Sequence, residues 1–139
     1  MKKYIALAAV LAALAWALVP HAAYTEDRDT VLLARAIYAL ARAESYETKL
    51  AVGSVALNRV ENPWFADTLG EVLTEQHQFP IGNRYDAECL SAAHEVLSGR
   101  HTLDPSALYY QSAAATQPRT DPPLETVGGF SFFAMDTDI

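Results

Sequence analysis

Apolar side chains recur along the first part of the chain at helical intervals. Between residues 31 and 44, four positions spaced i, i+4, i+7 and i+11 fall on one stripe of a helix. They are Leu33, Ile37, Leu40 and Glu44. Asp29 or Thr30 is the expected cap of this helix. The stripe is apolar until its last member, so the predicted helix ends in a carboxyl group.

A second and a third helix are predicted from caps and apolar runs. Ser45 can cap a helix whose part from Leu50 to Val60 is apolar nearly all the way round, which predicts burial on most sides. Pro63 prevents that helix from continuing. After a short helical turn over 68–74, Asp86 caps a third helix, and Gly99 is its expected left-handed stop.

Strand patterns appear only near the C-terminus. The short apolar and aromatic run 107–111 predicts one strand, and 127–134, with two glycines in its first half, predicts another. The Ala-, Thr- and Pro-rich segment 112–125 between them is expected to be a surface loop. This order predicts an α+β fold, with a small helical domain and a short antiparallel β-hairpin or sheet near the C-terminus.

The N-terminal segment has a different character from the rest. Two lysines precede residues 5–19, which are all apolar, and this arrangement is typical of an export signal. The run is somewhat shorter than the roughly 20 residues of a membrane span, so residues 1–23 are predicted to be a signal peptide or, alternatively, an N-terminal membrane anchor. Residues 24–30 would form a tether, and 31–139 the exported domain, with membrane contact only through residues 5–19.

Composition and charge exclude several classes of function. The chain has 139 residues and a net charge of −7, and without residues 1–23 it keeps 8 basic and 17 acidic residues. That acidity argues against nucleic-acid binding. Cys89 is the single cysteine, so no internal disulfide can form, and it is interpreted as a small buried hydrophobe. The four histidines share no zinc-binding spacing, so no metal and no cofactor are expected.

Glu44 is the sharpest candidate for chemistry. A carboxyl group buried on an apolar stripe can stay protonated near neutral pH, and glycosidic bond cleavage needs such a proton donor. The alternative is that the helix ends at Ala41 or Ala43, which would leave Glu44 an ordinary solvated acid.

Amide and aromatic side chains elsewhere are of the kinds that line sugar-binding sites, and each of them could equally belong to the core. The substrate-binding candidates are Gln78, Phe79, Tyr109 and Tyr110, with Trp64 as a further aromatic residue and His77 as a possible assistant in proton transfer.

In their order, several segments resemble the cell-wall hydrolase family typified by the spore cortex-lytic enzymes. The segments are Leu33-Ala-Arg-Ala-Ile-Tyr-Ala-Leu-Ala-Arg-Ala-Glu-Ser-Tyr-Glu, Ala51-Val-Gly-Ser-Val-Ala-Leu-Asn-Arg-Val60, Gln78-Phe79, Glu88-Cys89-Leu90 and Ala107-Leu-Tyr-Tyr110. The resemblance implies an exported, metal-free domain with a lysozyme-like or lytic-transglycosylase-like fold. It would act as a glycosidase or lytic transglycosylase on the glycan strands of peptidoglycan, in cell-wall or spore-cortex degradation. Separately, the domain is expected to be a monomer.

Two departures from the family pattern affect its chemistry. Leu40 stands where the family has an acid that the resemblance implies is catalytic, and Phe130 stands where the family has a histidine. Glu44 matches the family's second acid, and Ala43 replaces the glycine before it. Two hypotheses follow: Glu44 has taken over the acid role, or the domain is a catalytically inactive cell-wall-binding or lysis-regulating domain on the same fold.

Overall fold

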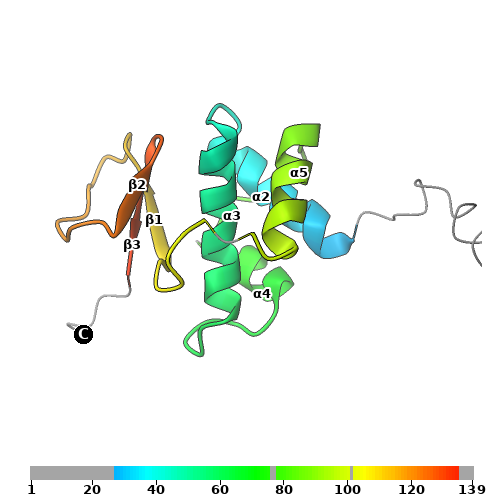
Figure 1. The fold of residues 1–139 in the computed structure, drawn as a ribbon, viewed down its shortest axis with the longest axis horizontal. Helices are drawn as coiled ribbons and strands as arrows, with labels where there is room; N and C mark the ends of the chain where they lie inside the picture. Colours follow the sequence, from blue (N-terminus) through cyan, green and yellow to red (C-terminus); the bar gives the residue numbers. More distant parts are fainter. Residues whose placement is uncertain (1–26, 76–77, 101, 135–139) are drawn as a thin grey trace, which may run out of the picture.

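The computed structural model describes residues 27–75, 78–100 and 102–134. Its helices and strands follow one another in the predicted order of helices first and sheet last (Figure 1). The elements are α2 (Arg28–Ala41), α3 (Tyr46–Val60), α4 (Leu69–Thr74), α5 (Ala87–Leu97), β1 (Tyr109–Ser112), β2 (Glu125–Val127) and β3 (Phe130–Phe133). The α+β class is therefore confirmed. The predicted signal peptide or anchor, residues 1–23, lies outside the described residues.

Helix α3 is the centre of the fold, as its nearly continuous apolar run predicts. It contacts α2, α4 and α5 as well as strands β1 and β2, and Figure 1 shows it between the other helices and the sheet. Its residues from Thr48 to Ala56 are all buried. Among them is Lys49, whose ammonium group lies 3.2 Å from the carboxylate of Glu88 on α5 and so avoids burial without a partner.

The sheet has three antiparallel strands in the order β1-β3-β2. Tyr110 of β1 pairs with Phe132 of β3, and Val127 of β2 pairs with Phe130. The predicted single strand over 127–134 is wrong in one respect, because it is divided by a turn at Gly128 and Gly129 into β2 and β3. Gly128 has a φ of +56°, a conformation that glycine adopts without the penalty other residues incur.

Most helix starts follow the predicted caps. The Ser45 hydroxyl accepts a hydrogen bond from the Thr48 N–H, and an Asp86 carboxylate oxygen accepts one from the Cys89 N–H at 2.8 Å. Helix α2 differs from the prediction, because it begins at Arg28 after Asp27 and not after Asp29 or Thr30. Residues 28–30 are consequently helical and do not belong to a tether.

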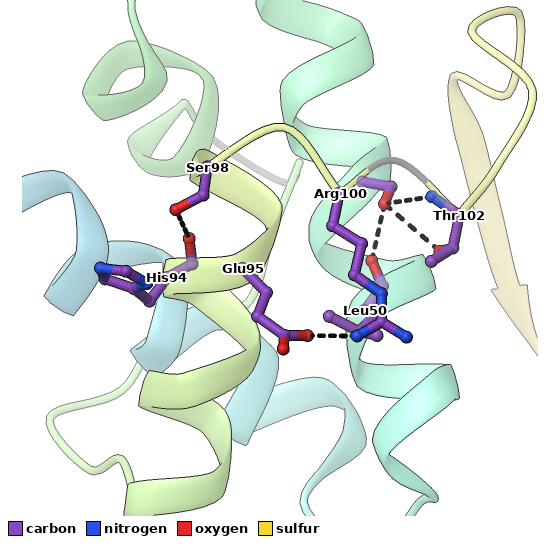
Figure 2. A network of polar contacts seen from close by, with 7 residues as sticks. Leu50, His94, Glu95, Ser98, Arg100 and Thr102 are labelled. Carbon is purple, nitrogen blue, oxygen red and sulfur yellow. Dashed lines mark hydrogen bonds and ion pairs between the residues drawn. The ribbon is translucent and has the colours of Figure 1, made fainter.

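A polar contact joins the segment after α5 to α3. The Ser54 hydroxyl donates to the Leu50 carbonyl at 2.7 Å and lies 3.5 Å from the hydroxyl of Thr102. Figure 2 shows this group beside the ion pair of Glu95 with Arg100, whose N···O distance is 2.9 Å. The chain can turn from the end of α5 toward Ser54 of α3 because Gly99, the predicted stop, has a φ of +104°.

Cys89 is fully buried on the apolar side of α5, as predicted. Burial raises the pKa of its thiol to about 12, and the nearby Asp86 carboxylate acts in the same direction. The thiol is therefore neutral at physiological pH and packs as a small apolar group.

In the described part of the chain, no helix has the length and apolar character needed to cross a membrane.

We expect Asp86→Ala to lower the free energy of unfolding by about 1 kcal/mol, because the Cys89 N–H loses its acceptor. Asp86→Asn should retain most of the cap.

The hydrogen bond from the Cys89 N–H also lowers the pKa of Asp86 in the folded state. The stabilisation of the fold by the Asp86 charge is thus complete above the ordinary pKa of an aspartate, and it is lost as the pH falls through the lower pKa that Asp86 has in the folded state. Denaturant unfolding at neutral and acidic pH measures both effects. If the parent and Asp86→Asn lost the same unfolding free energy at acidic pH, the predicted contribution of the Asp86 charge would be contradicted.

Candidate active site

Glu44 lies in the connection between α2 and α3. Helix α2 ends at Ala41, as the alternative interpretation of the sequence expected, so the predicted continuation of its apolar stripe to Glu44 is wrong. The Glu44 N–H donates to the Ala41 carbonyl at 3.0 Å, and Ser45 then caps α3. The early end arises because a residue before the Ser45 cap must leave helical geometry for the next helix to begin. Turn geometry, and not helix periodicity, places this carboxyl group.

The Glu44 side chain is half-buried and meets the turn between β2 and β3. One of its carboxylate oxygens, Oε2, accepts a hydrogen bond from the Gly129 N–H at 3.3 Å. A side chain at Gly129 would overlap with the other oxygen, Oε1, and one at Gly128 would overlap with the hydroxyl of Thr48. The two glycines therefore let the turn approach the carboxyl group closely enough for its backbone to donate to it.

The surroundings of Glu44 are polar. Glu44 immediately precedes the N-cap of α3, where the helix dipole stabilises a negative charge. The hydroxyls of Ser45 and Thr48 lie 2.9 Å apart at the same helix end. Glu44 is thus neither the acid on an apolar stripe nor the freely solvated acid that the sequence allowed. It is a carboxyl group fixed between a helix N-terminus and a backbone amide.

A second cluster forms around Arg59 at the other end of α3. The Arg59 side chain is only 3% exposed, and its Nε donates to the Leu108 carbonyl at 2.8 Å. Its Nη1 donates to the Gln78 side-chain carbonyl at 2.9 Å. Four rings surround the guanidinium carbon at 4.8 to 6.0 Å from their centroids. They belong to Phe65, Phe79, Tyr109 and Tyr110.

Arg59 brings together all four predicted substrate-binding residues. Gln78 is half-buried with its side-chain carbonyl held by Arg59, so its amide N–H donors are directed away from the guanidinium group. Phe79 is 6% exposed and packs against Tyr110 at a centroid distance of 5.3 Å, which places it in the core. Tyr109 contacts both Arg59 and Arg119 through its ring.

Burial changes the pKa values in this cluster. Desolvation lowers the pKa of Arg59, and the neighbouring phenols of Tyr110 and Tyr109 oppose that shift. Burial raises the pKa of Tyr110, so its phenol is neutral, and its hydroxyl donates to the Gln78 backbone carbonyl at 3.0 Å. Side chain and backbone of Gln78 are thereby both fixed.

Phe130 connects the two ends of the site. It follows Gly129 directly, is 4% exposed, and its ring centroid lies 6.3 Å from that of Tyr110. Leu40 is half-buried and packs against the core. The two apolar departures from the family pattern are therefore part of the packing that supports the site.

Sequence reasoning missed Arg59 although a signal was present. Arg59 is a charged residue in a helix that is apolar nearly all the way round, and a buried guanidinium needs partners. Trp64 does not join the cluster and is 79% exposed. His77 lies outside the described residues. In residues 27–75, 78–100 and 102–134, no group of three or more His, Cys, Asp or Glu side chains could hold a metal ion.

Comparison with known proteins agrees with this geometry. A sequence model described as Cell Wall Hydrolase matches residues 43–133, which is well over half of the chain. The chain belongs to the Cell Wall Hydrolase family. The match begins at Ala43, so it contains Glu44 and leaves out Leu40.

Relatives with curated descriptions are spore cortex-lytic enzymes. That of Bacillus subtilis is 37% identical over 89 residues, covering 60% of this chain and 29% of the relative. That of Oceanobacillus iheyensis is 34% identical over 114 residues, covering 76% of this chain and 41% of the relative. The chain thus matches less than half of the length of these relatives.

Two solved structures have the same fold. The catalytic domain of the Bacillus cereus SleB protein aligns with a TM-score of 0.68 at 27% identity, covering 76% of this chain and 88% of that one. The catalytic domain of the germination-specific lytic transglycosylase SleB from Bacillus anthracis gives 0.69 at 27% identity, covering 83% and 99%. The likeness confirms the lysozyme-like α+β architecture predicted from the sequence, and the match is to catalytic domains.

We expect Gly129→Ala to lower the free energy of unfolding by about 1 to 3 kcal/mol, because the added methyl group overlaps with the Glu44 carboxylate. Gly70→Ala is the matched control, since nothing lies within 4 Å of a side chain there and alanine favours helix α4. Denaturant unfolding compares the two variants. Equal stability of Gly129→Ala and the parent would show that the turn does not press against Glu44.

Proposed function

We propose that this chain cleaves the glycan strands of peptidoglycan and that Glu44 is its general acid. The proposal is supported by the family, by the likeness to two SleB catalytic domains, and by one observation at the site. That observation is the Glu44 carboxyl group, held against the Gly129 N–H at the turn of the sheet while its side chain remains half-exposed.

Breaking a glycosidic bond requires a proton on the leaving oxygen while the sugar ring gains oxocarbenium character. Glu44 in its acid form donates that proton and is left as a carboxylate. The Gly129 N–H and the N-terminus of α3 stabilise the charge that appears there. The carboxylate then removes a proton from the attacking group. Attack by water gives a hydrolysed product, and attack by a hydroxyl of the same sugar gives an anhydro sugar.

One carboxyl group is enough for the second of these routes. It can serve first as acid and then as base within a single turnover. A lytic transglycosylase mechanism is therefore compatible with Leu40 at the position where the resembled family has an acid. Gln78, with Tyr109 and Tyr110 beside it, is assigned to glycan binding, because its amide donors are fixed in place by Arg59. Phe79 supports this group from the core.

The place of action is proposed from the apolar N-terminal segment and from the relatives. Residues 5–19 would direct the domain out of the cytoplasm, where peptidoglycan lies, either released or tethered by that segment. The domain is proposed to work there as a monomer.

We expect Glu44→Gln to abolish clearing of purified peptidoglycan in a zymogram, with a fall in rate on the order of 10²-fold or more, because glutamine cannot donate the proton. Glu47→Gln is the matched control, since Glu47 is an exposed acid in the first turn of α3. Clearing that survives Glu44→Gln would overturn the assignment of the acid. A parent protein that binds peptidoglycan without clearing it would instead support the inactive, wall-binding alternative.

We expect Leu40→Glu to increase clearing, because it restores a carboxyl group at the family's acidic position, one residue before the end of α2. Ala39→Glu adds the same charge at the neighbouring exposed position and should leave clearing unchanged. The rate of turbidity loss of a peptidoglycan suspension measures both variants. A folded Leu40→Glu protein that clears no faster than the parent would show that position 40 no longer faces the glycan.

A further inference from the structure

Trp64 is the most exposed large hydrophobic side chain of the described residues. It is 79% exposed, compared with 49% for Leu124 and 39% for Tyr85. Tryptophan is usually well covered in folded proteins, because its indole contributes more apolar area than any other side chain. The interpretation of Trp64 as a core residue, which the sequence allowed, is therefore wrong.

The loop that carries Trp64 is fixed in place. The Trp64 N–H donates to the Asn62 side-chain oxygen at 2.9 Å, and the Phe65 N–H donates to the Asn62 carbonyl at 3.1 Å. On the next residue, the Phe65 ring packs against the Arg59 guanidinium and lies 6.2 Å from the Tyr109 ring. Backbone hydrogen bonds and the half-buried ring of Phe65 thus hold the loop from which the indole points outward, which lowers the entropy cost of binding.

This loop and Glu44 lie at opposite ends of the central helix. The α2–α3 connection precedes α3 and the loop 61–68 follows it, as Figure 1 shows. The 15 residues of α3 give a separation of about 22 Å at 1.5 Å per residue. One sugar ring cannot bridge that distance, whereas a strand of several sugars can. Gln78 and Tyr110, two of the predicted glycan-binding side chains, lie in the Arg59 cluster at the same end of α3 as this loop.

We propose that Trp64 is a stacking platform for a sugar ring of a glycan strand, several sugars away from the bond cut at Glu44. The apolar face of a pyranose ring packs on an aromatic face, so an exposed indole on an ordered loop suits it. The inference rests on the proposed function, since it takes the ligand to be glycan. Acidic neighbours favour a neutral ligand over an anionic membrane or nucleic acid, because Glu61 and Asp67 are exposed in the same loop.

Intrinsic fluorescence tests the contact directly. The chain has two tryptophans, so Trp16→Phe leaves Trp64 as the sole indole of the full-length protein. The Glu44→Gln background prevents cleavage during titration. We expect a hexasaccharide of N-acetylglucosamine to shift the Trp64 emission with saturation, and a disaccharide to bind much more weakly. No shift with the hexasaccharide would overturn the proposal, as would a larger shift with anionic phospholipid vesicles than with sugar.

A binding comparison separates Trp64 from a general surface effect. In the Glu44→Gln background, Trp64→Ala should bind insoluble peptidoglycan about tenfold more weakly, the effect of losing one aromatic contact of about 1.4 kcal/mol. Leu124→Ala, which removes another exposed apolar side chain, should bind like its parent. Unchanged affinity of Trp64→Ala would overturn this proposal alone. Absence of clearing by the parent, with Trp64-dependent binding retained, would overturn only the cleavage proposed at Glu44.

Discussion

The buried guanidinium of Arg59 is the interaction on which the arrangement of the site depends. A charge this deeply buried is tolerated only when its donors are paired. Its partners come from parts of the chain far apart in sequence: the carbonyl before β1, at Leu108, and the side chain of Gln78 in the loop after α4. By satisfying one cation, the fold fixes the sheet and this loop against the same end of α3. The rings of Phe65, Phe79 and the two tyrosines close around it and exclude water.

The other end of α3 is organised by a backbone contact. There the turn between β2 and β3 approaches Glu44 and Thr48 closely because Gly128 and Gly129 have no side chains. The two ends are not independent, since Phe130 follows this turn and packs on Tyr110, which binds Gln78. A change at either glycine would therefore affect the carboxyl group directly and the aromatic cluster through β3.

Local signals were sufficient to predict much of the fold. Ser45 and Asp86 each cap the helix that follows, as predicted, because a side-chain oxygen can satisfy a free N–H whatever the rest of the chain does. The buried character of α3 followed from its continuous apolar run. The family resemblance, carried by short segments in order, was enough to predict the architecture that the solved SleB domains confirm.

The sequence was less informative where distant segments decide the outcome. Apolar periodicity continued smoothly through Ala41, yet the start of α3 ended α2 before Glu44. Strand β2 is only three residues long and begins with exposed Glu125 and Thr126, so it had no apolar alternation to reveal it. The partners of Arg59 lie 19 and 49 residues away, beyond any periodic pattern.

Cys89 has a consequence for the environment in which the domain can work. Its thiol is fully covered by α5 and the core and stays protonated, and thiol–disulfide exchange requires an accessible thiolate. The Cys89 sulfur is therefore closed to oxidants and partner thiols while the fold is intact. A change in the surrounding redox potential therefore does not reach the folded domain through Cys89, and this cysteine does not cross-link one folded copy to another.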